Sequence, residues 1–196
     1  MNPDPYVYPG TTVLRNIPGI RKQELLDTFE ADRVGQRSLE LLEHPLSVRF
    51  DTAHLQEIHR YLFQDVYEWA GQFRTVDMAK GDSYFARVPY IESTLNSLFG
   101  KLSGGKHFRG LDQEAFAGRA AEILGTLNAV HPFRDGNGRA QREFVQELAR
   151  DNGYWIDWSK VSREEMYRAS EVSFMQADNA FFEELLKRAI EPMSLE

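Results

Sequence analysis

The chain contains no cysteine in its 196 residues. That absence excludes disulfide bonds, zinc sites built on thiolates and enzymes that use a cysteine nucleophile. It also fits a reducing compartment, where disulfides do not persist. We therefore look for chemistry among other side chains and expect a cytoplasmic protein.

The sequence also lacks long apolar runs and an excess of positive charge. No apolar stretch approaches the ~20 residues needed to span a bilayer, and the first 14 residues, with Asp4 and three prolines, do not resemble a signal peptide. A net charge of −7 argues against direct nucleic-acid binding and against binding to an anionic membrane, because both require a basic surface. We expect one globular domain over residues 1–196.

Most of the chain has a helical pattern. Residues 1–19 are rich in proline and glycine and are predicted to lie extended against the body. Apolar side chains then recur at helical spacing, with polar residues placed to cap the helix starts. The predicted helices cover residues 20–42, 51–66, 89–102, 112–127, 138–152, a stretch from 162 and a last helix from 178 to about 190, with Asp51, Asp112, Ser162 and Asp178 as N-terminal caps.

Residues 74–88 depart from this pattern. Two β-prone runs, 75–78 and 84–88, flank the turn residues 80–83, which is typical of a short hairpin. The predicted fold is therefore all-α, mostly helical, with one short β-hairpin.

The chemistry is concentrated in one segment, which comprises a connection and the helix after it, 131–152. Its first part reads His131-Pro132-Phe133-Arg134-Asp135-Gly136-Asn137-Gly138-Arg139-Ala140-Gln141-Arg142. A glycine turn that leads into a helix N-terminus is an anion site, because free N–H groups and the helix dipole face the ligand.

The residues around that turn suit a nucleotide triphosphate. Asp135 is the natural ligand for Mg²⁺, which favours one or two carboxylates plus phosphate oxygens. Arg139 and Arg142 are three apart, on one helix face, and can both reach phosphate. His131 is the one nearby group suited to proton transfer near neutral pH. Asn137 is expected to take up the left-handed turn between two glycines.

This segment resembles the motif of the Fic family, His-Pro-Phe-x-(Asp/Glu)-Gly-Asn-Gly-Arg-x-x-Arg, at every specified position. Trp69-Ala70-Gly71 with Arg74, Gly153-Tyr154 and the start Asp4-Pro5-Tyr6 are also similar to Fic proteins, the start to the small bacterial Fic toxins. The family typically moves AMP from ATP to a hydroxyl side chain of a target protein and releases pyrophosphate. Doc-type members, which phosphorylate their target, carry lysine at the position of Gly138, so the resemblance favours AMP transfer.

The resemblance implies a role for each motif residue. His131 would accept the proton of the target's Ser, Thr or Tyr hydroxyl, and Asp135 would hold Mg²⁺. Phe133 would anchor the loop in the core. The implied anion hole is Gly136, Asn137 and Gly138, and the implied phosphate contacts are Arg139 and Arg142.

The hairpin resembles the flap of the family, a name used below for residues 74–88. There the target's modified segment is held by strand addition. Ser83, Tyr84, Phe85 and Ala86 would form the contact strand. Without the motif, the hairpin would more readily be interpreted as a packing feature.

Many Fic proteins carry an inhibitory glutamate in the pattern (Ser/Thr)-x-x-x-Glu-(Gly/Asn), which pairs with the second motif arginine. No Ser or Thr of this chain has Glu four residues later; Thr52 is followed by Gln56. The resemblance therefore implies a toxin whose inhibitor is a separate small helical antitoxin. In that subgroup the targets are the ATPase subunits of type II topoisomerases, DNA gyrase and topoisomerase IV.

Other interpretations stay open. Transfer of another nucleotide or of a phosphate-linked group is one, and a non-catalytic binding module that retains the fold is another. His54 and His59 lack metal-ligand spacing and are expected at the core edge or the surface. Arg134 is expected to be solvated.

Overall fold

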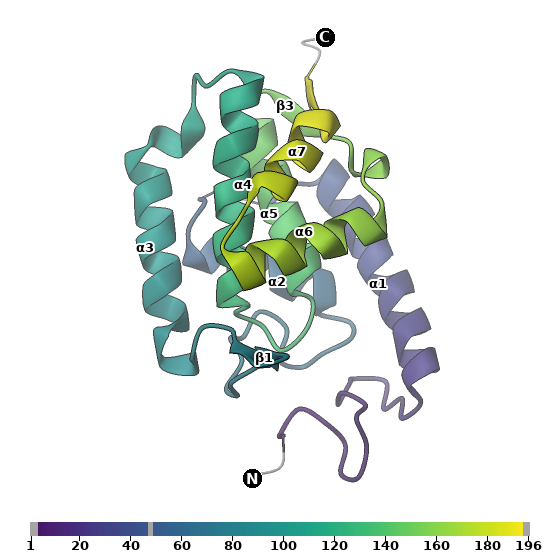
Figure 1. The fold of residues 1–196 in the computed structure, drawn as a ribbon. Helices are drawn as coiled ribbons and strands as arrows, with labels where there is room; N and C mark the ends of the chain where they lie inside the picture. Colours follow the sequence, from purple (N-terminus) through teal and green to yellow (C-terminus); the bar gives the residue numbers. More distant parts are fainter. Residues whose placement is uncertain (1–3, 47–48, 194–196) are drawn as a thin grey trace.

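In the computed structural model, which describes residues 4–46 and 49–193, most of the backbone is α-helical, as predicted (Figure 1). The helices are α1 (Gln23–Glu43), α2 (Thr52–Phe63), α3 (Ile91–Gly104), α4 (Gln113–Val130), α5 (Asn137–Asp151), α6 (Arg163–Gln176) and α7 (Ala180–Ala189), with short 3₁₀ turns η1 (Val88–Tyr90), η2 (Lys106–Phe108) and η3 (Trp158–Lys160). No helix within the described ranges is long and apolar enough to cross a membrane.

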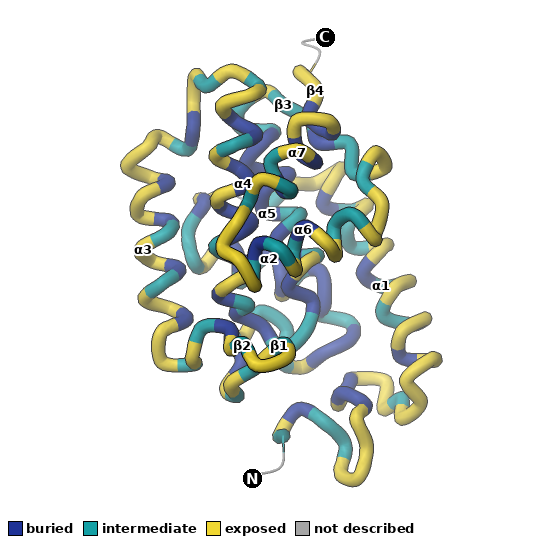
Figure 2. The backbone as a smooth tube through the Cα atoms, viewed as in Figure 1, coloured by how far each residue is buried: buried dark blue, intermediate teal, exposed yellow. Residues whose placement is uncertain are grey.

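Helices α4 and α5 form the centre of the molecule. Helix α4 contacts α3, α5, α6 and α7, while α2 packs on α5 and α1. Figure 2 shows the buried backbone concentrated in this central group, with α1 and α3 exposing their outer sides. The connection between α4 and α5, which carries the motif, is thus held between two helices that the core fixes in place.

Three of the predicted caps are confirmed. Asp51, Asp112 and Ser162 each accept a hydrogen bond from a backbone N–H in the first turn of their helix. Asp178 also accepts one, from Ala180, although Asn179 is the capping residue of α7. Helix α2 ends at Phe63, short of the predicted end at position 66.

The flap is a shorter hairpin than the sequence predicts. Strands β1 (Ala79–Lys80) and β2 (Ser83–Tyr84) pair antiparallel, whereas strands over 75–78 and 84–88 were expected. Beyond this pair one further backbone bond, from the Phe85 N–H to the Met78 carbonyl, joins the arms, and side chains make the other links. The Arg74 guanidinium donates to the carbonyls of Val76 and Ala86, and the Asp77 carboxylate accepts from the Val88 N–H and from Arg87. These bonds link the two arms of the hairpin to each other.

A second strand pair was not predicted. Strand β3 (Tyr154–Ile156) pairs antiparallel with β4 (Ile190–Pro192), which directly follows α7. The last predicted helix ended at about position 190, but no local pattern indicated that the chain after α7 returns to the end of α5. This pairing depends on a contact between segments that α6 and α7 separate in the sequence.

The N-terminal segment, described from residue 4, is not helical, but it folds through several turns and is not the extended segment that the sequence predicts. Val7 and Leu14 form an isolated β-bridge, and the Ile17 N–H donates to the Val66 carbonyl at 2.9 Å. The Tyr6 hydroxyl accepts the N–H of Thr75, the second residue of the flap. Figure 1 places this segment and β1 at the same end of the molecule, where the motif loop also lies.

Candidate active site

One cavity of about 1070 Å³ brings the motif residues together. Its lining includes His131, Asp135, Gly136, Asn137, Gly138, Arg139 and Arg142, with residues of α1, η3 and α6 opposite them. Phe133 is not in the lining, because its ring is buried beneath the loop. The α4–α5 connection therefore presents a possible base, a carboxylate, a helix N-terminus and two guanidinium groups to one space.

His131 ends α4 in the left-handed backbone conformation, with φ 48° and ψ 60°. That conformation is uncommon for a residue with a side chain and is typical of functional turns. The imidazole stacks on the Phe85 ring from the flap, with centroids 4.1 Å apart. Burial lowers the pKa of His131 to about 4, so the ring is neutral at pH 7 and able to accept a proton.

Arg74 ties the flap to this histidine. Its fully buried guanidinium donates to the carbonyls of His131, Val130 and Ala86, so one side chain joins the C-terminal end of α4 to the flap. Its partners are carbonyl oxygens, which makes it a cross-link of backbone segments and not half of an ion pair. The sequence offered Arg74 only as part of a family resemblance.

The turn before α5 has the features of an anion site. No side chain caps the α5 N-terminus, so its first N–H groups face the cavity. Gly136 takes the left-handed conformation at φ 77°, and a Cβ there would lie 2.3 Å from the Phe63 ring. The prediction that Asn137 supplies the left-handed turn is wrong. Asn137 is already helical, and its side-chain amide exchanges two hydrogen bonds with the backbone of Phe133.

His59 holds the other side of this loop. The prediction that His54 and His59 lie at the core edge or the surface is wrong, because both side chains are fully buried. The His59 ring lies between Phe63 and Phe133, with centroids 4.6 and 3.8 Å away. Its Nδ1 accepts the Gly71 N–H, so Nε2 carries the proton and donates to the Asp135 carbonyl at 2.9 Å. Burial lowers the pKa of His59 to about 4.

The sequence did contain a signal for His59. The apolar stripe of α2 is Leu55, Ile58, Leu62 and Phe63, and His59 fills the one missing position of the i, i+3, i+4, i+7, i+8 pattern. A histidine within such a stripe must find partners for both ring nitrogens in the interior. Its partners here belong to two glycine-containing loops, which lie far apart in the sequence.

The two motif arginines have different surroundings. Arg139 lies 2.6 Å from a Glu30 carboxylate oxygen of α1, whereas Arg142 has no carboxylate partner among residues 4–46 and 49–193. Burial, aided by the nearby charge of Arg139, lowers the pKa of Arg142. A partly buried guanidinium with no counter-charge favours the arrival of an anion. Arg134 is not simply solvated as predicted, because it pairs with Asp4 at 2.8 Å.

Asp135 is the residue that fits a metal ion. Its side chain is 47% exposed, borders the cavity and accepts the Gly136 N–H. No group of three acidic or histidine side chains in the described ranges could hold a cation by itself. One carboxylate beside a turn with the features of an anion site suits Mg²⁺, which is commonly held by one or two carboxylates plus phosphate oxygens.

The flap residues predicted to contact a target divide into two kinds. Tyr84 is 57% exposed, but Phe85 is buried between His131 and Phe174. The N–H groups of Phe85 and Ala86 already donate to the Met78 and Ala129 carbonyls. Ser83 and Tyr84 are thus the part of this strand that faces outward.

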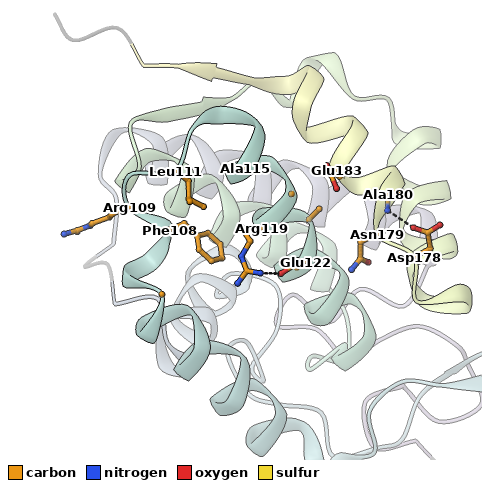
Figure 3. Close-up of a pocket in the computed structure, with 13 residues that line it drawn as sticks. Phe108, Arg109, Leu111, Ala115, Arg119, Glu122, Asp178, Asn179, Ala180 and Glu183 are labelled. Atoms are coloured by element: carbon orange, nitrogen blue, oxygen red, sulfur yellow. Dashed lines mark hydrogen bonds and ion pairs between the residues drawn. The ribbon is translucent and has the colours of Figure 1, made fainter.

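A second hollow, of about 710 Å³, lies between α4, the η2 turn and the start of α7 (Figure 3). Its lining includes Phe108, the surface ion pair Arg119–Glu122 and residues at the N-terminus of α7, and none of the motif residues. Because the titratable and anion-binding groups of the motif are elsewhere, this hollow is not the candidate active site.

Comparison with known proteins agrees with this geometry. The model of the Fic/DOC family matches residues 49–149. The chain belongs to the Fic/DOC family. The matched range begins before α2, which supplies His59, and ends within α5.

Several named proteins are similar to this Fic chain. It is 47% identical over 171 residues to protein adenylyltransferase VbhT of Bartonella schoenbuchensis, covering 87% of this chain but 36% of VbhT. It is 38% identical over 172 residues to the probable protein adenylyltransferase Fic of Escherichia coli K12, covering 88% of this chain and 85% of that one. The chain thus spans about a third of VbhT but most of the Escherichia coli protein.

Solved structures have the same fold. BepC from Bartonella tribocorum, crystallised with bound AMPPNP, superposes with a TM-score of 0.89 at 29% identity and covers 96% of this chain and 97% of that one. An N-terminal Fic domain from Bartonella quintana with bound ADP gives the same TM-score and identity. These neighbours hold adenine nucleotides on the fold described here.

Proposed function

We propose that this chain is a protein adenylyltransferase, which transfers AMP from ATP to a hydroxyl side chain of a target protein and releases pyrophosphate. The observation that carries the proposal is the cavity in which a half-buried neutral histidine, an uncapped helix N-terminus and two arginines meet. The names of relatives 37–47% identical, and the adenine nucleotides in similar structures, support the same activity.

In this reaction the target hydroxyl oxygen attacks the α-phosphorus of ATP while His131 accepts the hydroxyl proton. A new P–O bond joins AMP to the target, and the bond between the α-phosphorus and the bridging oxygen breaks, so pyrophosphate leaves. The N–H groups at the α5 N-terminus face the α-phosphate oxygens, and Arg139 and Arg142 bind the outer phosphates. Catalysis then rests on positioning and on stabilisation of charge.

Asp135 would hold Mg²⁺ together with phosphate oxygens of the nucleotide. The ion supplies neutralisation of the charge that develops on the leaving pyrophosphate. The protein's own part is to fix Asp135 in place. His59 does so by holding the Asp135 carbonyl at 2.9 Å, and the Gly136 N–H holds the carboxylate from the other side.

The flap would hold the target. Strand β2 consists of Ser83, which is half-buried, and Tyr84, which is exposed. An extended segment that adds to this edge would place its hydroxyl near His131, because Phe85, the next residue, stacks on that ring. Main-chain pairing specifies little sequence, so target choice has to come from other contacts. The resemblance to the toxin subgroup leads us to propose the ATPase subunits of DNA gyrase and topoisomerase IV as targets in the cytoplasm.

A separate antitoxin would hold the enzyme inactive. Arg142 lines both the motif cavity and an adjoining cavity of about 290 Å³ between α1 and the β3–η3 segment. A helical partner in this space could place a glutamate on Arg142, which has no carboxylate partner in the described ranges, and so exclude the γ-phosphate. Removal of that glutamate should restore activity while the partner remains bound through its other contacts.

The test is incubation of a bacterial lysate with the protein and ATP, followed by mass spectrometry for hydroxyl-linked AMP. His131→Ala is the matched control, and thermal shifts with ATP, GTP and CTP report which nucleotide binds. AMP adducts that require His131 support the proposal. Labelling by another nucleotide, or saturable binding without any adduct, would instead support the alternative transferase or the non-catalytic module.

A further inference from the structure

A carboxylate from outside the motif holds the first motif arginine. Glu30 of α1 places Oε1 2.6 Å from Nη2 of Arg139, and its side chain is only 13% exposed. The other carboxylate oxygen accepts the hydroxyl of Tyr67, which lies in the connection between α2 and the flap. Desolvation of Tyr67, with the hydrogen bond to Glu30, raises the pKa of the hydroxyl, so it remains a donor.

This contact fixes the direction of the Arg139 guanidinium. The group lies 4.6 Å from the centroid of the Phe63 ring, the same ring that excludes a side chain at Gly136. The ion pair with Glu30 and the contact with the Phe63 ring together therefore determine the direction of the Arg139 N–H donors. Both Glu30 and Arg139 line the motif cavity.

Glu30 also competes with Asp135 for this arginine. Arg139 lies 3.7 Å from Asp135, four positions earlier in the chain, against 2.6 Å from Glu30. Without Glu30, the flexible arginine would close the i,i+4 pair with Asp135. That pair would cover the one carboxylate that fits a metal ion and would turn the guanidinium away from the outer phosphates.

We propose that Glu30, held by Tyr67, is a positioning residue that keeps Arg139 on the phosphate subsite and keeps Asp135 free for the metal ion. The inference rests on the proposed AMP transfer and adds a residue that lies outside the motif, on α1. It predicts how both ATP affinity and the Mg²⁺ requirement of ATP binding should change when Glu30 is replaced. Loss of Glu30 weakens ATP binding and raises the Mg²⁺ concentration that binding requires, whereas a purely structural role would leave the Mg²⁺ requirement unchanged.

The experiment measures ATP affinity by calorimetry across a series of Mg²⁺ concentrations, with melting temperature as the control for folding. Glu30→Ala should weaken ATP binding about tenfold, the size expected for loss of a charge-assisted hydrogen bond, and should raise the half-saturating Mg²⁺ concentration. Glu30→Gln retains an acceptor through its carbonyl oxygen and should recover part of the affinity. Tyr67→Phe should show the same pattern more weakly.

Glu24→Gln is the matched control, because it removes the same charge from an exposed position on the same helix. It should bind ATP as the unmodified protein does. If Glu30→Ala binds ATP equally or more tightly at the same Mg²⁺ requirement, Glu30 does not position Arg139 and the inference is wrong. If the unmodified protein and Glu24→Gln bind no ATP at all, the proposed function fails instead.

Discussion

The motif loop and the flap meet at His131, but different contacts hold them. The loop, residues 131–142, is fixed by buried groups packed against it: Gly136 against Phe63, and Asp135 by His59. The flap has two residues per strand and depends on the side chains of Arg74 and Asp77. A turn packed against buried rings, beside a short hairpin, suits the proposed enzyme, which would bind a nucleotide at the loop and an extended segment at the flap.

His131→Ala should show the largest effect and should separate chemistry from binding. Loss of a general base typically costs roughly 10²–10⁴-fold in rate, whereas the phosphate contacts made by α5 and the two arginines remain. AMP transfer should therefore collapse while ATP affinity, measured by calorimetry, stays near that of the unmodified protein. AMP transfer at an unchanged rate would show that His131 is not the general base.

A matched pair of glycine substitutions tests the difference in rigidity directly. Gly136 and Gly81 both have positive φ, 77° and 58°. A Cβ at Gly136 would clash with the Phe63 ring, whereas at Gly81 it would meet no atom within 4 Å. Gly136→Ala should destabilise the protein by about 2–5 kcal/mol, from left-handed backbone strain plus overpacking against Phe63, and should abolish ATP binding. Gly81→Ala at the flap tip should cost only about 1–2 kcal/mol of backbone strain.

Thermal unfolding and nucleotide titration of both variants decide this point. Equal losses of stability would mean that the loop is no more tightly constrained than the flap. Retained ATP binding by Gly136→Ala would show that the turn can shift without loss of the anion site.

A second pair of variants concerns the flap alone. Tyr84→Pro should slow target modification more than Tyr84→Ala, because proline removes a main-chain N–H and restricts the strand. ATP affinity should be the same in both, since Tyr84 is exposed and does not line the motif cavity. Rates of target labelling at saturating ATP test this, and equal rates for the two variants would argue against strand addition.

Local pattern and tertiary contact explain what the sequence could and could not predict. The caps at Asp51, Asp112 and Ser162 depend on residues within one helical turn, so they were visible in the sequence. The β3–β4 pair joins segments on either side of α6 and α7, and left no local signal.

The same division holds within the site. The motif segment contains the histidine, the metal-type carboxylate, the helix N-terminus and the two arginines on which the proposed chemistry rests, so these groups could be named from the sequence. Glu30 and His59 act on it from α1 and α2, and their partners are defined only once the helices pack. Arg134 was misjudged for the same reason, because its partner Asp4 is distant in the chain.

The smallest predicted effect is a change in the pKa of His131, in the motif loop, on substitution of a flap residue. Phe85 is a flap residue, yet its ring covers the imidazole of His131, whose pKa burial lowers to about 4. Phe85→Ala should admit water and move that pKa upward, toward the ordinary value near 6.5. Titration of the imidazole by NMR measures the shift, and Tyr84→Ala, an exposed change on the adjacent residue, should leave the midpoint where it was.

The same substitution should change how stability depends on pH. Because the folded His131 binds its proton only near pH 4, the unfolded chain takes up protons first as the pH falls below about 6.5, and the fold loses stability down to about pH 4. His59, with its pKa also near 4, contributes similarly to this loss and is untouched by the substitution. Phe85→Ala should therefore reduce the acid sensitivity without removing it. An unchanged imidazole midpoint would mean that the Phe85 ring does not contribute to the burial that lowers the pKa of His131.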